Sequence, residues 1–263
     1  MPFTFCESHV ADYMSQGYTV FRGILPPSLV KDLRRVAEKG RQLAREEHGP
    51  QAQRIQPIAK YDLDEKPFRD YAELPVLIDA IQKVIGPEAW YGDFDKLGFL
   101  LEPATSPWCL PWHRDLTADT PGVDAQELES IRYEKACFNQ VNCALYDDSC
   151  TWFVPGSHCR DDVASELEHV KNCPTPDRNK VTEFGLSDEE IEMRCLEYCR
   201  AMPRAVCLHL GVGDFALYRP LGWHLGNYVP YHIRATLHDI VWTPQVKEWY
   251  QRWEVRRDAV LKG

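Results

Sequence analysis

The residues best suited to chemistry are His113 and Asp115, in the segment PWHRD at positions 111–115. On a β-strand, residues two positions apart project from the same face of the sheet. An imidazole and a carboxylate on one face supply two of the three ligands of a 2-His-1-carboxylate site, which holds Fe(II) and leaves coordination positions open. Because H-x-D is short enough to occur by chance, the site needs a second histidine. His224, in the segment LGWH, is the best candidate.

Arg234 follows His224 by ten residues, and the segment VPGSH at 154–158 lies between the two halves of the candidate site. Inside a barrel, an arginine is a buried cation that needs an anion, and a carboxylate held through two parallel hydrogen bonds meets that need. On the surface, Arg234 would be an ordinary ion-pair partner. His158, beside a Pro-Gly turn, is expected to support the site through hydrogen bonds and not to bind the metal.

This order of motifs resembles the phytanoyl-CoA dioxygenase family, whose members are Fe(II)- and 2-oxoglutarate-dependent oxygenases on a double-stranded β-helix. The resemblance extends from about Gly17 to Trp242. It implies that iron is bound by His113, Asp115 and His224, that the distal carboxylate of 2-oxoglutarate is bound by Arg234, and that Asn142 and Thr236 lie near the cosubstrate.

The resemblance also implies a reaction that consumes O2 and 2-oxoglutarate and releases succinate and CO2. Its relatives that halogenate have Gly or Ala at the position of Asp115, so hydroxylation of a small-molecule metabolite is the expected outcome. Desaturation and ring formation remain open. The chain departs from the family pattern at Arg114, where Gln is common, at Cys150, where Gly is usual, and at 225–227. These positions are expected near the pocket mouth, so no particular substrate carries over.

A second class of function uses the same barrel. Cupin-like binding proteins, metal-dependent isomerases and hydrolases would hold zinc or manganese with His113, Asp115 and His224. Such a protein would have no need of Arg234 at this spacing, so cosubstrate binding distinguishes the two classes. Arg114, Arg219 and Trp223 are either contacts for a polar or acidic substrate or structural residues.

The composition is that of a globular protein: 263 residues, 44% hydrophobic and 27% charged. The formal net charge of −10 argues against binding to nucleic acid or to a membrane surface. The N-terminus lacks the features of a secretory signal, and no apolar run is long enough to span a membrane. A cytoplasmic protein is expected, as a monomer or a homodimer. The ten cysteines are irregularly spaced, which favours small apolar residues over disulfides or a zinc site.

The pattern of elements predicts a mainly β protein with flanking helices, folded as one domain over 1–263. A first strand is expected at 17–23, helices from Pro26 to about 49 and at 75–84, and strands from Ala89 onward, including the H-x-D segment. Trp108 and Trp112 flank that segment, either as pocket walls or as core. A terminal helix is expected from Pro244.

A polar insertion at about 159–204 interrupts the barrel strands. Ser187 and Glu190 have the spacing of a capping box, which predicts a helix through about Met202. Cys195 and Cys199 would share one face of this helix. A connection of this length is either a lid that orders over the pocket when substrate binds or a solvated helix without a role in the chemistry.

Overall fold

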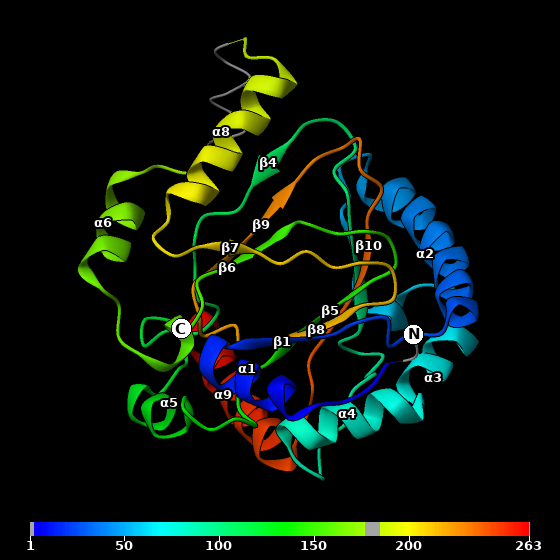
Figure 1. Ribbon diagram of the computed structural model, residues 1–263, viewed down its shortest axis with the longest axis horizontal. Helices are drawn as coiled ribbons and strands as arrows, with labels where there is room; N and C mark the ends of the chain where they lie inside the picture. Colours follow the sequence, from blue (N-terminus) through cyan, green and yellow to red (C-terminus); the bar gives the residue numbers. More distant parts are fainter. Residues whose placement is uncertain (1–2, 177–184, 263) are drawn as a thin grey trace.

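The computed structural model describes residues 3–176 and 185–262 of the chain. Two antiparallel sheets form its centre, and helices cover their outer faces (Figure 1). The larger sheet has six strands in the order β1 (Tyr18–Phe21), β8 (Phe215–Tyr218), β5 (Gln140–Ala144), β10 (Ala235–Asp239), β3 (Gly98–Leu101) and β2 (Arg54–Ile55). The smaller sheet has the order β4 (Trp108–Cys109), β9 (His224–Tyr228), β6 (Thr151–Phe153) and β7 (Val206–Cys207).

The described helices are α1 (Glu7–Gln16), α2 (Pro27–His48), α3 (Lys66–Ala72), α4 (Pro75–Ile85), α5 (Ala125–Ile131), α6 (Ala164–Asn172), α8 (Asp188–Ala201) and α9 (Pro244–Lys262), with short 3-10 helices η1 (Ile58–Lys60) and η2 (Ser157–Cys159). The helices predicted from Pro26, from Pro75 and from Pro244 are all present. The capping box of α8 is formed, with the Glu190 backbone N–H donating to Ser187 Oγ. The predicted helix of the insertion is therefore confirmed.

The larger sheet separates the hydrophobic core from the interior of the barrel. Alternate residues along a strand face opposite sides, and on β5 the side chains of Val141 and Cys143 enter the core whereas Asn142 lines a cavity. The same division holds on β10, where Leu237 lies in the core and His238 lines the cavity. The interior of the barrel is thus available for polar residues.

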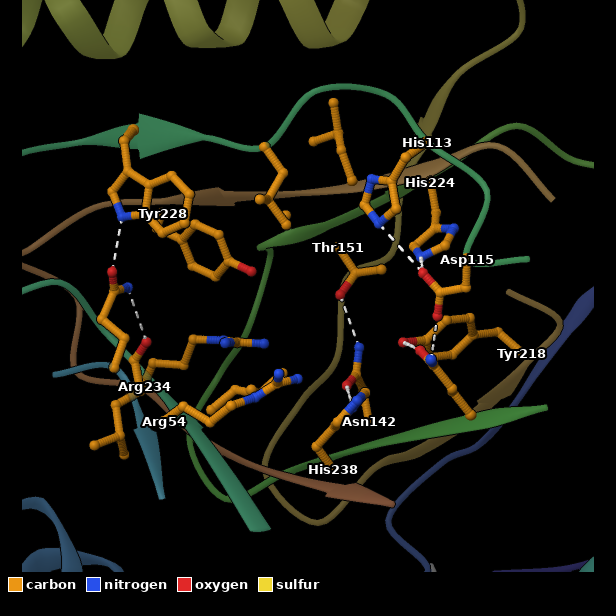
Figure 2. A pocket seen from close by; sticks show the side chains of 18 residues that line it. Arg54, His113, Asp115, Asn142, Thr151, Tyr218, His224, Tyr228, Arg234 and His238 are labelled. Atoms are coloured by element: carbon orange, nitrogen blue, oxygen red, sulfur yellow. Dashed lines mark hydrogen bonds and ion pairs between the residues drawn. The ribbon is translucent and has the colours of Figure 1, made fainter. Parts of the chain in front are cut away.

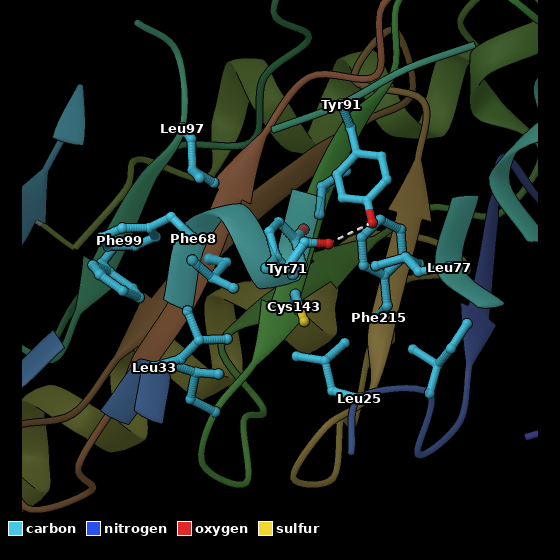
Figure 3. Close-up of a cluster of buried hydrophobic side chains, with 14 of the residues drawn as sticks. Leu25, Leu33, Phe68, Tyr71, Leu77, Tyr91, Leu97, Phe99, Cys143 and Phe215 are labelled. Carbon is cyan, nitrogen blue, oxygen red and sulfur yellow. Dashed lines mark hydrogen bonds between the residues drawn. The ribbon is translucent and has the colours of Figure 1, made fainter. Parts of the chain in front are cut away.

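The core lies between the larger sheet and helices α2, α3 and α4. Figure 3 shows this cluster, with labelled side chains that include Leu33, Phe68, Tyr71, Leu77, Phe99, Cys143 and Phe215. The hydroxyl group of Tyr91 donates a hydrogen bond to the backbone carbonyl of Tyr71. Burial of these large apolar side chains supplies the main stabilisation of the fold, because each removes apolar surface from water. The core thereby fixes the strands that carry the pocket.

The described part of the insertion carries helices α6 and α8, and α8 packs against β4 and β9 of the smaller sheet. Its apolar face, with Ile191, Cys195 and Cys199, is buried in a cluster that also contains Trp112 and Trp223. Cys195 and Cys199 therefore share a buried face, and their thiols are free. Residues 177–184 of the insertion lie outside the described residues. Helix α8 is therefore not a fully solvated helix, because it packs against the barrel wall. The lid, which concerns ordering when substrate binds, stays a prediction.

The H-x-D segment is not a regular strand, contrary to the prediction. Strand β4 ends at Cys109, and only His113 forms an isolated bridge, with His224 on β9. Pro111 interrupts the ladder, because proline has no N–H to donate to a neighbouring strand. The Asp115 backbone N–H instead bonds the carbonyl of Pro220, in the loop before β9. The loop that precedes β9 thus orients the carboxylate.

Candidate metal centre and its pocket

His113, Asp115 and His224 converge at one end of a pocket between the two sheets (Figure 2). Their potential ligand atoms all lie within 4.8 Å of one another. The Nε2 atoms of His113 and His224 each lie 3.4 Å from Oδ1 of Asp115. Among the described residues, no other group of three histidine, cysteine or acidic side chains comes together in this way. The structure therefore brings together the three residues predicted as iron ligands.

Both histidines are held in the tautomer that metal binding requires. Nδ1 of His113 lies 2.8 Å from the carbonyl oxygen of Pro111, and Nδ1 of His224 lies 2.9 Å from that of Gly222. A carbonyl oxygen can only accept, so each Nδ1 must carry the proton. In the neutral ring each Nε2 then offers its lone pair to a metal, and in the protonated ring the same Nε2 donates to Asp115. A hydrogen bond of this kind fixes the ring orientation of metal-binding histidines.

The electrostatics of the three residues favour a cation among them. Burial raises the pKa of Asp115, but hydrogen bonds and charge from His113 and His224 outweigh burial and hold that pKa well below its usual range. Burial lowers the pKa of His113, but the hydrogen bonds with Asp115 and Pro111 and the charge of Asp115 together outweigh burial, so the net shift is upward. A carboxylate that remains ionised beside two imidazole lone pairs is a donor set suited to Fe(II). The residues present thus fit a divalent metal.

Gln140 and Tyr218 extend the site beyond its three ligands. The Gln140 side chain donates through Nε2 to Oδ2 of Asp115 and accepts a hydrogen bond of 2.7 Å from the Tyr218 hydroxyl. These two residues are direct cross-strand partners on β5 and β8. The sequence analysis missed both. Gln140 could have been found, since it lies two positions before Asn142 and so on the same face of the strand.

The pocket has a volume of about 320 Å³, which is in the range of small-molecule sites. Both sheets line it, with Leu100 and Asn142 from the larger sheet and Thr151 and Leu225 from the smaller one. Trp108 also lines the pocket, and its ring stacks on Tyr228 with the ring centroids 4.7 Å apart. Trp112 is instead buried in the cluster beneath α8. Trp108 is therefore a wall of the pocket, and Trp112 is part of the core.

Arg234 lines the same pocket and is 4% exposed. It already has an anion: its Nε lies 3.2 Å from Oδ1 of Asp148, and its Nη2 lies 3.4 Å from Oδ2. Burial raises the pKa of Asp148, but the charge of Arg234 and hydrogen bonds with Cys150 and Arg234 together outweigh burial and lower it. Nη1 of Arg234 has no hydrogen-bond partner in the described chain. This nitrogen of the guanidinium thus remains for a ligand.

Asn142 and Thr236 occupy different places. Asn142 lines the pocket, donates to Thr151 and lies within hydrogen-bond distance of His238. Thr236 is completely buried, does not belong to the residues that line the pocket, and donates to Oδ2 of Asp148 at 3.2 Å. Thr236 lies two residues before His238 on the same face of β10, and there its side chain meets Asp148 instead of the pocket. Its contact with the site is through Asp148.

Three residues considered as substrate contacts are structural. Arg114 donates to the carbonyls of Ser157 and Leu221 and pairs with Asp162, and its guanidinium lies over the Trp223 ring. Trp223 donates to Asp162 through its indole nitrogen. Arg219 is buried and donates to backbone carbonyls that precede β5. None of the three lines the pocket of the metal centre.

His158 lies outside the metal centre, as predicted, but its hydrogen bond is with α1 and does not support the site. It belongs to η2 and is completely buried, with its Nε2 3.2 Å from the carbonyl oxygen of Met14 in α1. Its ring also packs against Gly17, whose φ of +86° lies in the left-handed region. A Cβ at Gly17 would come within 2.4 Å of Nδ1 of His158, so glycine is required there on both counts. The VPGSH turn thus anchors the N-terminal helix.

No protein-family model matches the sequence, and no curated protein matches it. Solved structures do match the fold. SnoK, a non-heme alpha ketoglutarate dependent carbocyclase from nogalamycin biosynthesis, is 16% identical with a TM-score of 0.57 over 92% of this chain and 86% of that one. HygX from Streptomyces hygroscopicus, solved with nickel and 2-oxoglutarate bound, is 12% identical with a TM-score of 0.56 over 92% and 88%. AviO1 from Streptomyces viridochromogenes Tue57 is 15% identical with a TM-score of 0.58 over 90% and 94%.

At these identities the similarity establishes the fold and nothing finer. None of the described helices is long and apolar enough to cross a membrane. The two antiparallel sheets with flanking helices match the architecture of SnoK and of SnoN, a non-heme alpha ketoglutarate dependent epimerase. The chain therefore has the double-stranded β-helix fold of 2-oxoglutarate-dependent enzymes, and the predicted fold class is confirmed.

Proposed function

We propose that the protein is an Fe(II)- and 2-oxoglutarate-dependent oxygenase of the phytanoyl-CoA dioxygenase type. The observation that carries this proposal is the geometry of His113, Asp115 and His224, whose Nε2 and Oδ1 atoms face one another at the end of a pocket. The same pocket contains the guanidinium of Arg234. A metal centre with a cation beside it is what a chelating dicarboxylate requires.

The residues of the pocket would have different roles in such a reaction. His113, Asp115 and His224 would hold iron, which when bound supplies the activation of O2 coupled to conversion of 2-oxoglutarate to succinate and CO2. Arg234 would bind the distal carboxylate of 2-oxoglutarate through its free Nη1. Asn142 would contribute a polar contact in the same pocket, while Thr236 would position Asp148. The walls of the pocket would orient the substrate and exclude water.

The substrate we propose is a small-molecule natural product, hydroxylated by default because Asp115 occupies the ligand position. Support comes from the neighbours in fold: SnoK and SnoN are enzymes of nogalamycin biosynthesis, and SnoN was solved in complex with alpha ketoglutarate and nogalamycin RO. We also propose that residues 1–263 act as one catalytic domain, because residues as far apart in sequence as Arg54 and His238 line the pocket of the metal centre.

The test is a titration of the Fe(II)-loaded protein with 2-oxoglutarate under anaerobic conditions. Chelation of iron by a 2-oxo acid gives a visible charge-transfer band, and we expect this band for the wild-type protein. Asp115→Ala should weaken iron binding and with it the band, because it removes the carboxylate ligand. Asp119→Ala, at an exposed position four residues away, should retain it. A wild-type protein that binds metal without giving this band would instead be a cupin-like metal-binding barrel.

A further inference from the structure

Arg54 is a second arginine that enters the pocket. Strand β2 pairs with β3 in the register Arg54 to Leu100 and Ile55 to Phe99. Cross-strand partners share a face of the sheet. Ile55 and Phe99 are accordingly buried in the core, whereas Arg54 and Leu100 both line the pocket. Figure 2 shows the Arg54 and Arg234 side chains extending toward the middle of the pocket.

The two arginines differ in what neutralises them. The Arg234 guanidinium is paired with Asp148 through Nε and Nη2. The side chain of Arg54 forms no ion pair or hydrogen bond with residues 3–176 or 185–262. Its charge is nevertheless close enough to His238 to contribute, after burial, to the lowering of that pKa to about 4. Arg54 is therefore the cation of the pocket that lacks a counter-ion.

The balance of charge shows which ligand would supply that counter-ion. His238 is neutral near pH 7, so the charged groups at the pocket are Arg54, Arg234, Asp115 and Asp148, together with the metal. The two aspartates offset the two arginines, and the double charge of Fe(II) then equals the double negative charge of 2-oxoglutarate. Without Arg54, the loaded pocket would carry one uncompensated negative charge. Arg54 is itself exposed to solvent, so what it offers a ligand is an unpaired guanidinium and not a buried charge.

We propose that Arg54 binds the distal carboxylate of 2-oxoglutarate, jointly with Nη1 of Arg234. This assignment rests on the proposed function. The pairing with Asp148 uses Nε and Nη2 of Arg234 for an anion of the protein itself, and leaves Nη1 as the guanidinium nitrogen without a partner. A second guanidinium, on the neighbouring side of the same pocket, completes the site. Arg54 is thus a cosubstrate-binding residue on an edge strand, far in sequence from the iron ligands.

The experiment compares two chelating 2-oxo acids that differ only at the distal end. The probes are 2-oxoglutarate and 2-oxopentanoate, which has the same chain length but ends in a methyl group. Each is titrated anaerobically into the Fe(II)-loaded full-length protein, and the charge-transfer band reports its dissociation constant. Arg54→Met should raise the dissociation constant for 2-oxoglutarate by about 10- to 100-fold, as expected for loss of a charge-assisted hydrogen bond. The constant for 2-oxopentanoate should change by less than about twofold.

Two further variants serve as controls. Arg54→Lys keeps the charge and loses the planar fork, so its affinity for 2-oxoglutarate should lie between wild type and Arg54→Met. Arg35→Met removes an exposed arginine that is paired with Asp64 outside the pocket, and should change neither constant. Binding of 2-oxopentanoate by Arg54→Met also demonstrates that this variant is folded and loaded with metal.

The outcomes separate this inference from the proposed function. If wild type gives the band and Arg54→Met binds 2-oxoglutarate with unchanged affinity, or weakens both probes equally, the assignment of Arg54 is overturned and the proposed function stands. If wild type gives no band with either probe, the proposed function falls and the assignment falls with it. Selective weakening of 2-oxoglutarate supports both.

Discussion

Asp115 uses its two carboxylate oxygens for different partners. Oδ1 faces the Nε2 atoms of His113 and His224, whereas Oδ2 accepts a hydrogen bond from Gln140. Gln140 is itself fixed, since its carbonyl oxygen accepts from the hydroxyl of Tyr218. An oxygen that is engaged with an amide is less available to a metal. The arrangement therefore favours ligation by Oδ1 alone and leaves more positions open for ligands.

We expect Gln140→Leu to weaken metal binding by about 10- to 100-fold, the usual cost of losing a residue that orients a ligand. The substitution frees Oδ2 of Asp115 and allows the carboxylate to rotate. Tyr218→Phe should have a smaller effect, because it removes only the group that orients Gln140. Competition with a chelator for Fe(II) or Co(II) measures both variants. Metal affinity equal to wild type in Gln140→Leu would show that Asp115 needs no such support.

The ligands could be predicted from sequence because a metal restricts the residue types that can bind it. His113, Asp115 and His224 needed only their identity and order. Asp148 and Arg54 could not be predicted in their roles, since acidic and basic residues are common and their partners depend on how distant strands align. Asp148 lies in a turn between β5 and β6, and the sequence gives no indication that it pairs with a residue on β10.

At the scale of elements, α8 is tied to the irregular segment that carries two of the ligands. The hydroxyl group of Tyr198 accepts a hydrogen bond of 3.1 Å from the backbone N–H of Trp112, the residue before His113. Pro111 has no N–H, so the strand ladder is interrupted at this point. Tyr198 supplies from a helix an acceptor that a neighbouring strand does not provide. The insertion thus contributes to the position of the metal ligand.

We expect Tyr198→Phe to lower the free energy of unfolding by about 1–3 kcal/mol, because it leaves the buried N–H of Trp112 without an acceptor. It should also weaken metal binding, since His113 follows directly. Tyr133→Phe is the matched control, because Tyr133 is 46% exposed and its hydroxyl lies at the surface. Urea unfolding and metal titration measure both effects. A loss of stability no larger than that of the control would mean that Trp112 is satisfied by water.

The elements that the sequence predicted are those with a clear hydrophobic period. Helices α2 and α4 place buried residues at helical spacing, so their positions follow from the sequence. Helix α1 buries only Tyr13, and α3 has seven residues with a proline in its first turn. Neither helix has apolar residues at a clear helical spacing, and neither was predicted from the sequence. Tertiary contacts, rather than local pattern, stabilise such elements.

At the scale of the whole molecule, His158 connects the stability of the fold to pH. Burial, with a smaller contribution from the charge of Arg219, lowers the pKa of His158 to about 4, from an ordinary value of 6.5. The folded protein therefore resists protonation that the unfolded chain accepts. The contribution of neutral His158 is complete above about pH 6.5 and is lost as the pH falls toward 4. Asp239, whose pKa burial raises to about 7, acts in the opposite direction.

A comparison with His158→Gln isolates the effect, because all other titrating groups are common to both proteins. We expect wild type to be more stable than the variant at pH 7.5. The difference should shrink by about 2–3 kcal/mol at pH 4.5, since each pKa unit corresponds to about 1.4 kcal/mol. Urea unfolding at the two pH values measures it. If the difference in the free energy of unfolding between wild type and His158→Gln did not depend on pH, His158 would not be the group that takes up the proton on unfolding.

The division of the larger sheet into two faces has a consequence for how such a protein can diversify. Leu100, Gln140, Asn142, Tyr218 and His238 line the pocket, whereas their neighbours along each strand pack beneath the helices. A substitution at a pocket position changes the shape and polarity presented to a ligand while leaving the packing on the other side intact. Ligand preference and fold stability can therefore vary almost independently. Libraries aimed at a new substrate would best be confined to those alternate positions that support neither the metal ligands nor the cosubstrate, such as Leu100.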